Sequence, residues 1–250
     1  NTCIACNQAC LDHVFQRRIA SCLVNPRAGH ETELVYAPTR QPKRIAVVGA
    51  GPAGLACATV LAERGHRVDL FDAADAIGGQ FNLAKLIPGK EEFRETLRYF
   101  GRRIAVTGVE LRLGTRVTAD DLIAGAYDEI VLATGVMPRD PRIDGDDEQR
   151  GAGRLLSYVD VLLARRSVGR RVAIVGAGGI GFDVAEYLVA GEHSTATDLP
   201  AWMAEWGVGD PAATRGGLRP QQVSPPEREV HLLQRKATPL GKGLGKTTGW

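Results

Sequence analysis

The stretch Arg44-Ile45-Ala46-Val47-Val48-Gly49-Ala50-Gly51-Pro52-Ala53-Gly54 decides the fold of this 250-residue chain. Its first five residues predict a buried parallel strand, and the apolar residues from about Ala53 to Arg64 predict a helix. Three glycines stand between the two in the order G-x-G-x-x-G. Gly49 permits a sharp turn, Gly51 lets the backbone approach a pyrophosphate, and Gly54 lets the helix pack closely on the strand. The stretch therefore predicts a Rossmann-like dinucleotide-binding unit of an α/β fold.

A second strand with an acidic end follows this unit. Arg67–Phe71 is the predicted strand, and Asp72 comes directly after it, 23 residues beyond Gly49. A carboxylate at that place can accept hydrogen bonds from a ribose diol. Because an acidic residue would repel a 2′-phosphate, the pattern indicates a ribose that carries none.

Later segments indicate that this dinucleotide is FAD. Gly78-Gly79-Gln80 and the apolar run Tyr127–Gly135, which predicts a strand ending in a turn of small residues, resemble patterns of flavoprotein reductases with two dinucleotide domains. The small residues that end this run permit close approach of the backbone to a cofactor. Glu92–Phe100 predicts an amphipathic helix, and Val109–Val117 predicts a strand whose backbone lies beside the adenine. The alternative is an ordinary doubly wound domain whose glycines bind nothing. The candidate FAD-binding residues are Gly49, Gly51, Gly54, Asp72, Gly79, Gln80, Lys90, Val117, Ala133, Thr134 and Gly135.

The same strand, turn and helix pattern occurs a second time. Arg171–Val175 predicts a strand, and Gly176, Gly178 and Gly181 repeat the glycine spacing before a helix that ends at about Val189. One chain therefore carries two predicted nucleotide sites.

The second unit differs from the first in the charge at the end of its next strand. Glu229–Leu233 is that predicted strand, and Gln234-Arg235-Lys236 follows it where the first unit has Asp72. Arg235 and Lys236 favour a 2′-phosphate, because a guanidinium can bind it through two hydrogen bonds. The predicted ligand is NADPH; the alternative is a solvated strand end without a ligand.

Four cysteines lie near the start of the chain. Cys3, Cys6, Cys10 and Cys22 form a C-x2-C-x3-C-x11-C array, and Cys57 is the only other cysteine. Three ligands within eight residues and a fourth further along favour a [4Fe-4S] cluster. Zinc and disulfide pairing remain alternatives. Disulfides are disfavoured because the rest of the chain has the pattern of a cytoplasmic nucleotide-binding enzyme, in which thiols stay reduced.

Composition excludes some classes of partner. The net charge is +2, without a basic stripe interleaved with aromatic residues, so nucleic acid is not an expected partner. The most apolar stretch, Ile45–Ala62, is interrupted by glycine and proline, so it is not expected to span a membrane.

An unusually long insertion separates the second helix from its next strand. Ala190–Arg228 is rich in glycine, proline and polar residues, yet it contains Trp202, Met203 and Trp206. Packing against its own domain is the common role of such tryptophans, and an interface with another domain is the alternative.

These motifs together resemble the bacterial NADPH-dependent 2,4-dienoyl-CoA reductases, a family grouped with trimethylamine dehydrogenase and enoate reductases. The resemblance covers essentially the whole chain. It rests on the two glycine motifs and on the segments Cys3–Cys10, Ser21–Ala28, Gly178–Asp183, Gln234–Lys236 and Leu244–Trp250.

The resemblance implies an architecture and an electron path. The implied order is a cluster-binding segment at 1–30, a linker at 31–43, the first part of an FAD domain at 44–170 and an incomplete NADPH domain at 171–250. Electrons pass from NADPH to FAD, then through the cluster to FMN, for reduction of 2,4-dienoyl-CoA in fatty acid degradation. The FMN barrel of the family precedes the region matched here, so we expect a fragment and name no catalytic residue.

Two other functions remain open from the sequence. One is another enzyme of the group, an enoate reductase or an amine dehydrogenase. The other is a non-catalytic module that binds zinc and a nucleotide.

Overall fold

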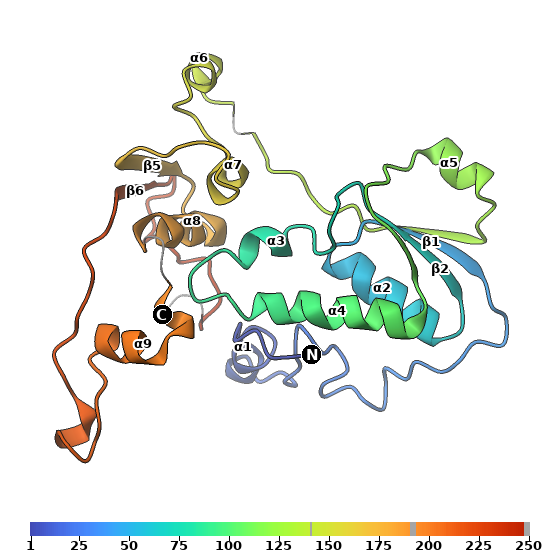
Figure 1. Cartoon of the computed structure of the whole chain (residues 1–250), viewed down its shortest axis with the longest axis horizontal. Coiled ribbons are helices and arrows are strands. Elements are labelled where there is room, and N and C mark those ends of the chain that lie inside the picture. Colours follow the sequence, from blue (N-terminus) through green and yellow to red (C-terminus); the bar gives the residue numbers. More distant parts are fainter. Residues whose placement is uncertain (141, 191–193, 248–250) are drawn as a thin grey trace. The chain divides into compact units, whose positions relative to one another are not determined.

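The computed structural model describes residues 1–140, 142–190 and 194–247, and the chain divides into two units (Figure 1). Unit 1 comprises Asn1–Ala84 and Glu92–Pro141. Unit 2 comprises Lys85–Glu91 and Arg142–Trp250. The chain thus leaves unit 1 for one short segment, returns to it, and then continues into the rest of unit 2.

Unit 1 is built on a parallel sheet of four strands in the order β3-β2-β1-β4. The central strand β1 is buried because it pairs on both sides: Val47 lies opposite Leu70 of β2 and Val131 of β4. The expected bounds of β1 and β2 are confirmed. The strands are β1 (Arg44–Val48), β2 (Arg67–Phe71), β3 (Glu110–Arg112) and β4 (Glu129–Leu132).

Helices cover both faces of this sheet. Alternate residues of β1 point to opposite faces, as the period of a strand requires. Val47 packs with Leu55 and Ile104 on the face that α2 and α4 cover, whereas Ala46 packs with Leu122 of α5 on the other. The helices of unit 1 are α1 (Leu11–Phe15), α2 (Pro52–Glu63), α3 (Phe81–Ala84), α4 (Phe93–Thr107) and α5 (Ala119–Ala124).

Two expectations for unit 1 were wrong in extent. The helix expected at Glu92–Phe100 continues through Thr107, because its apolar face extends to the buried Ile104 and a left-handed Gly108 ends it. The strand expected at Val109–Val117 is only Glu110–Arg112 long. After it, the backbone N–H groups of Gly114 and Thr115 bond to the loop that follows β2 and leave the ladder.

Unit 2 contains a two-stranded parallel sheet with one covered face. Val172 and Ile174 of β5 pack with Val184 of α8, while Val175 on the opposite face is 60% exposed. The expected bounds of β5 and β6 are confirmed. The elements are α6 (Asp146–Gly151), α7 (Tyr158–Leu162), β5 (Arg171–Val175), α8 (Gly179–Val189), α9 (Leu199–Trp206) and β6 (Glu229–Leu233), with short 3-10 turns at Thr195–Thr197 and Arg215–Gly217.

The long insertion of unit 2 is folded around α9. Asp198 accepts a hydrogen bond from the Ala201 N–H and caps this helix, and Gly207 ends it with φ +65°. Trp202 and Trp206 lie next to each other on α9, with ring centroids 6.1 Å apart, and Trp206 is 57% exposed. An interface at these tryptophans stays a prediction. No helix among the described residues is long and apolar enough to cross a membrane.

A buried carboxylate joins β1, β2 and the loop before β4 in unit 1. Asp69 on β2 accepts hydrogen bonds from the Tyr127 hydroxyl at 2.7 Å and from Arg44 at 3.0 Å. The Arg44 guanidinium also lies over the Tyr127 ring, 4.3 Å from its centroid. A buried charge of this kind requires such partners, since an unpaired carboxylate is costly to remove from water. Burial, followed by the bond to Asp69, raises the pKa of Tyr127.

Replacing Tyr127 with Phe is expected to lower the free energy of unfolding by about 1–3 kcal/mol, because Asp69 loses a donor while it stays buried. Urea unfolding measures the change. Tyr99→Phe is the matched control, since the Tyr99 ring packs against Phe100 and, among the described residues, its hydroxyl group has no buried carboxylate as a partner. Equal stabilities of the two variants would contradict the role assigned to the buried pair.

Candidate functional site

The first glycine turn lies where the carboxyl ends of β1, β2 and β4 meet. Gly49 donates its N–H to the Phe71 carbonyl at 2.7 Å, and Ala133 donates to the Val48 carbonyl at 2.8 Å. Gly49 has φ +109°, and a Cβ there would lie 2.2 Å from the Ala133 carbonyl oxygen. In parallel sheets of this kind, ligands bind just outside the carboxyl ends of the strands, at the point where the order of the strands reverses. The turn therefore lies where a cofactor site is expected.

The other two glycines of the turn have opposite surroundings. A Cβ on Gly54 would lie 1.8 Å from the Gly49 carbonyl oxygen, so only glycine allows α2 to pack here. A Cβ on Gly51 would meet no described atom within 4 Å. Gly51 is the N-cap of α2, and within the described chain no side chain caps that helix. Its first N–H groups are therefore available to an anion such as a pyrophosphate.

Asp72 lies at the end of β2 and bonds to the glycine turn. One carboxylate oxygen accepts the Ala50 N–H at 2.6 Å, and the other accepts the Ala74 N–H at 2.8 Å. These bonds fix the orientation of the carboxylate. Each oxygen retains capacity for a further hydrogen bond, so Asp72 can accept from ribose hydroxyls as well.

Other predicted FAD residues converge on the same turn. Gly79 has φ +52°, and a Cβ there would lie 3.3 Å from the Gly51 Cα. The Gln80 side chain donates to the Val136 carbonyl at 2.9 Å, which ties it to the segment after Ala133, Thr134 and Gly135. The structure thus brings together most of the residues that were predicted to bind FAD.

Two predicted FAD residues are placed differently. Val117 lies beyond the end of β3 and is half-buried against the cluster of Ala46, Phe71 and Leu122. Lys90 belongs to unit 2, where its ammonium group pairs with Asp183. Their contact with FAD stays a prediction.

The second glycine turn repeats the geometry of the first. Gly176 has φ +124° and donates its N–H to the Leu233 carbonyl of β6 at 2.9 Å. A Cβ on Gly181 would lie 2.0 Å from the Gly176 carbonyl oxygen, and one on Gly178 would meet no described atom within 4 Å. In both turns, therefore, the second glycine is open to a ligand and the third packs tightly against the first.

The two predicted phosphate-binding cations follow β6. Arg235 and Lys236 are exposed, and neither forms an ion pair within the described residues. The Gln234 side chain donates to the carbonyls of Lys236 and Thr238, so it holds the turn in which both cations lie. Two unpaired cations on a braced turn are suited to bind a 2′-phosphate.

The cysteine segment is folded, but its thiols do not converge. The Ser21 N–H donates to the Ala9 carbonyl at 2.7 Å. Cys10 directly follows Ala9 and Cys22 directly follows Ser21, so this bond joins the segments that carry the two cysteines. Cys3 accepts the Ala5 N–H at 3.3 Å. Across residues 1–140, 142–190 and 194–247, no three His, Cys, Asp or Glu side chains are arranged to hold a metal ion. Four thiols suit iron–sulfur chemistry as donors, and their assignment as ligands, Cys6 included, stays a prediction.

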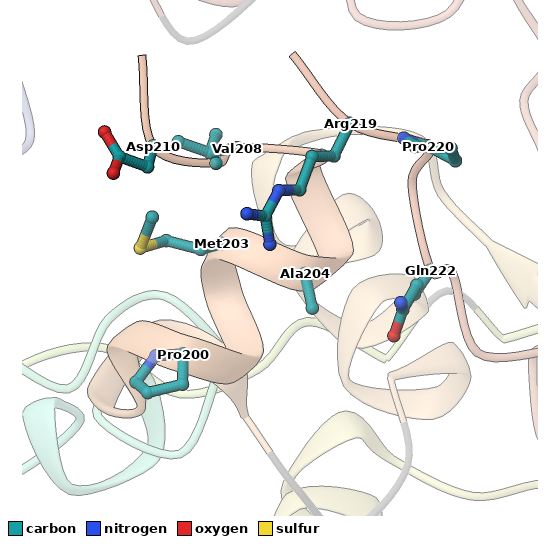
Figure 2. A pocket seen from close by; sticks show the side chains of 9 residues that line it. Pro200, Met203, Ala204, Val208, Asp210, Arg219, Pro220 and Gln222 are labelled. Atoms are coloured by element: carbon teal, nitrogen blue, oxygen red, sulfur yellow. The ribbon is translucent and has the colours of Figure 1, made fainter. Parts of the chain in front are cut away.

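A groove in the insertion was not predicted from the sequence. It has a volume of about 510 Å³ and lies between α9 and the loop that follows it (Figure 2). A Cβ on Gly209 would lie 2.4 Å from the Arg219 side chain. The glycines of this loop are therefore the feature of the sequence that could have indicated close packing. The lining residues are Pro200, Met203, Ala204, Val208, Gly209, Asp210, Arg219, Pro220 and Gln222.

Comparison with known proteins identifies the class of this fold. Residues 43–248 match the family described as Pyridine nucleotide-disulphide oxidoreductase. Thr248, which ends that match, and Gly249 and Trp250, which end the segment used in the resemblance, lie outside the described residues.

Among curated proteins, the chain is 34% identical to the metal reductase of Desulforamulus reducens, over 99% of this chain and 36% of that protein. It is 32% identical to the cinnamate reductase of Clostridium sporogenes, over 74% of this chain and 27% of that protein. The chain thus spans about a third of the length of these relatives.

Among solved structures, a 2-naphthoyl-CoA reductase in complex with 2-naphthoyl-CoA matches with a TM-score of 0.71 and 30% identity. The match covers 93% of this chain and 39% of that chain. The likeness therefore extends through nearly all of both units.

Substituting Ala at Gly51 and at Gly54 should separate ligand binding from folding. Gly54→Ala is expected to lower the free energy of unfolding by about 1–3 kcal/mol, because its methyl group meets the Gly49 carbonyl. Gly51→Ala is expected to leave stability within about 0.5 kcal/mol and to weaken FAD binding about ten-fold or more. Urea unfolding and FAD titration measure the two effects; normal FAD affinity in Gly51→Ala would be the contrary result.

Proposed function

We propose, from the premise that the chain belongs to the Pyridine nucleotide-disulphide oxidoreductase family, that it moves electrons between a nicotinamide nucleotide and FAD. The single observation that carries this proposal is the repeated glycine turn. Gly54 contacts the Gly49 carbonyl, and Gly181 contacts the Gly176 carbonyl, in the same geometry. Two such turns in one chain provide for two different dinucleotides.

In unit 1, the proposed ligand is FAD. The open position at Gly51 and the uncapped start of α2 receive the pyrophosphate, and Asp72 accepts hydrogen bonds from the adenosine ribose. Gly79 and the Ala133–Gly135 segment lie close to the turn, so their backbone forms part of the wall of the proposed site.

In unit 2, the proposed ligand is NADPH. The start of α8 receives the pyrophosphate, and Arg235 and Lys236 bind the 2′-phosphate. When both cofactors are bound, the nicotinamide supplies a hydride and the flavin accepts it. The residues of this chain contribute binding and orientation; we assign no proton transfer to any of them.

The cysteine segment is proposed to hold a [4Fe-4S] cluster on Cys3, Cys6, Cys10 and Cys22. The spacing of the thiols and the bond that joins their two segments support this assignment. A cluster supplies one-electron transfer when bound. A cytoplasmic location is proposed as well, because the rest of the chain has the pattern of a nucleotide-binding enzyme of a reducing compartment.

The proposed substrates of the whole protein are unsaturated acyl compounds with conjugated double bonds. Similarity to a cinnamate reductase and to a 2-naphthoyl-CoA reductase supports this class. Within it, 2,4-dienoyl-CoA, reduced at an FMN site outside this chain, remains the specific proposal from the sequence resemblance. The metal reductase is the relative that favours a second candidate, in which electrons leave the protein to a metal ion.

Neutralising the two cations of unit 2 should change nucleotide preference. In Arg235→Gln with Lys236→Gln, the dissociation constant of NADPH is expected to rise about ten-fold or more, because two charge-assisted hydrogen bonds to the 2′-phosphate are lost. That of NADH should hardly change. Fluorescence titration with both nucleotides measures this, and equal effects on the two would indicate a solvated strand end.

The cluster assignment has an analytical test. Anaerobic reconstitution of the chain with iron and sulfide is expected to give about four iron atoms per chain, as a cubane cluster requires. Cys10→Ala should lose them, whereas Cys57→Ala, the matched control on α2, should keep them. Stoichiometric zinc without iron would exclude the assignment.

A further inference from the structure

The segment Lys85–Glu91, here called the arm, belongs to unit 2 and forms an ion pair with α8 there. Ile87 is 1% exposed and is among the most fully buried side chains of the chain. Lys90 donates its backbone N–H to the Ile87 carbonyl at 3.0 Å, and Gly89 between them has φ +80°. This tight turn fixes the position from which the Lys90 side chain extends.

Lys90 reaches the first half of α8. Its Nζ atom lies 2.6 Å from Asp183 Oδ1, and both side chains are about one-third exposed, at 33% and 32%. Asp183 is four residues beyond Gly179, the first residue of α8. At the rise of an α-helix, this is about 6 Å along the axis from the helix start. The pair is therefore close to the turn at which a nucleotide pyrophosphate would lie.

Negative charge predominates around this pair. Partial burial of the Glu186 carboxyl raises the pKa of that group. The negative charges of Asp183 and Glu91 raise this pKa further, whereas the positive charge of Lys90 lowers it. Glu91 Oε2 is buried and accepts no hydrogen bond from any described residue. Among the described residues, the charges that act on Glu186 are those of Asp183, Glu91 and Lys90, of which Lys90 is the cation. Without Lys90, Asp183 would be an unpaired carboxylate in the first half of α8, with the carboxyl groups of Glu186 and Glu91 near it.

We propose that Lys90 is a positioning residue for nucleotide binding, which acts by pairing with Asp183 and so removes a negative charge near the pyrophosphate site at the start of α8. This inference rests on the proposed binding of NADPH by unit 2. Removal of Lys90 leaves the Asp183 carboxylate unpaired. The negative charge of Asp183 then repels the pyrophosphate, which NADPH and NADH both contain. For charges about 10 Å apart near a protein surface, the expected loss of affinity is about three- to ten-fold.

The test is a titration of the chain with NADPH and with NADH at low and high salt. Lys90→Met is expected to raise both dissociation constants about three- to ten-fold at low salt, with a smaller difference at high salt. Lys90→Arg should retain the wild-type values. The matched control is Lys43→Met, which removes the same charge from an ion pair of the same 2.6 Å length with Glu129, in unit 1.

Two further variants separate charge from damage to the fold. Asp183→Asn should bind both nucleotides more tightly than wild type, a direction that structural damage does not produce. Combining Asp183→Asn with Lys90→Met should return the dissociation constants to near wild type.

Three results would overturn the inference. One is that Lys90→Met binds as Lys43→Met does; another is that Asp183→Asn fails to compensate for it. A wild-type chain that binds neither nucleotide would overturn the proposed function together with this inference.

Discussion

The close contact between Gly54 and the Gly49 carbonyl is the constraint on which the nucleotide sites depend. It permits α2 to start directly above the end of β1, so the free N–H groups of the helix face the crevice at the strand ends. Asp72 can bond to the Ala50 N–H only because this turn brings the backbone to the end of β2. The same contact in unit 2, between Gly181 and the Gly176 carbonyl, gives α8 the same relation to β5.

The two units use this shared turn with different charges around it. In unit 1 a carboxylate ends the second strand, and in unit 2 two exposed cations occupy the corresponding place after Leu233. The family match over residues 43–248 covers both units, so a pair of dinucleotide sites is a property of the fold. The differing charges are what we propose assigns FAD to one and NADPH to the other, with the arm adjusting the charge beside α8.

Local pattern was sufficient to predict four of the strands and the two turns, because apolar runs bounded by glycine specify them with little help from tertiary contacts. The bounds of β1, β2, β5 and β6 were predicted in this way. Val109–Val117 was misjudged because an apolar pattern does not show where backbone groups find partners, and Gly114 bonds elsewhere. The pairing of Lys90 with Asp183 joins residues far apart in sequence, and no spacing reveals it. The cysteine spacing predicted ligands and not their arrangement, since metal binding itself organises such ligands.

The central claim is that one chain holds two separate dinucleotide sites. Equilibrium dialysis of the chain against FAD and NADPH together, with the bound amount of each measured over a range of the other, tests this most directly. The account predicts that both ligands bind saturably and that saturation with one leaves binding of the other intact. Mutual displacement of FAD and NADPH at a single shared site would contradict it.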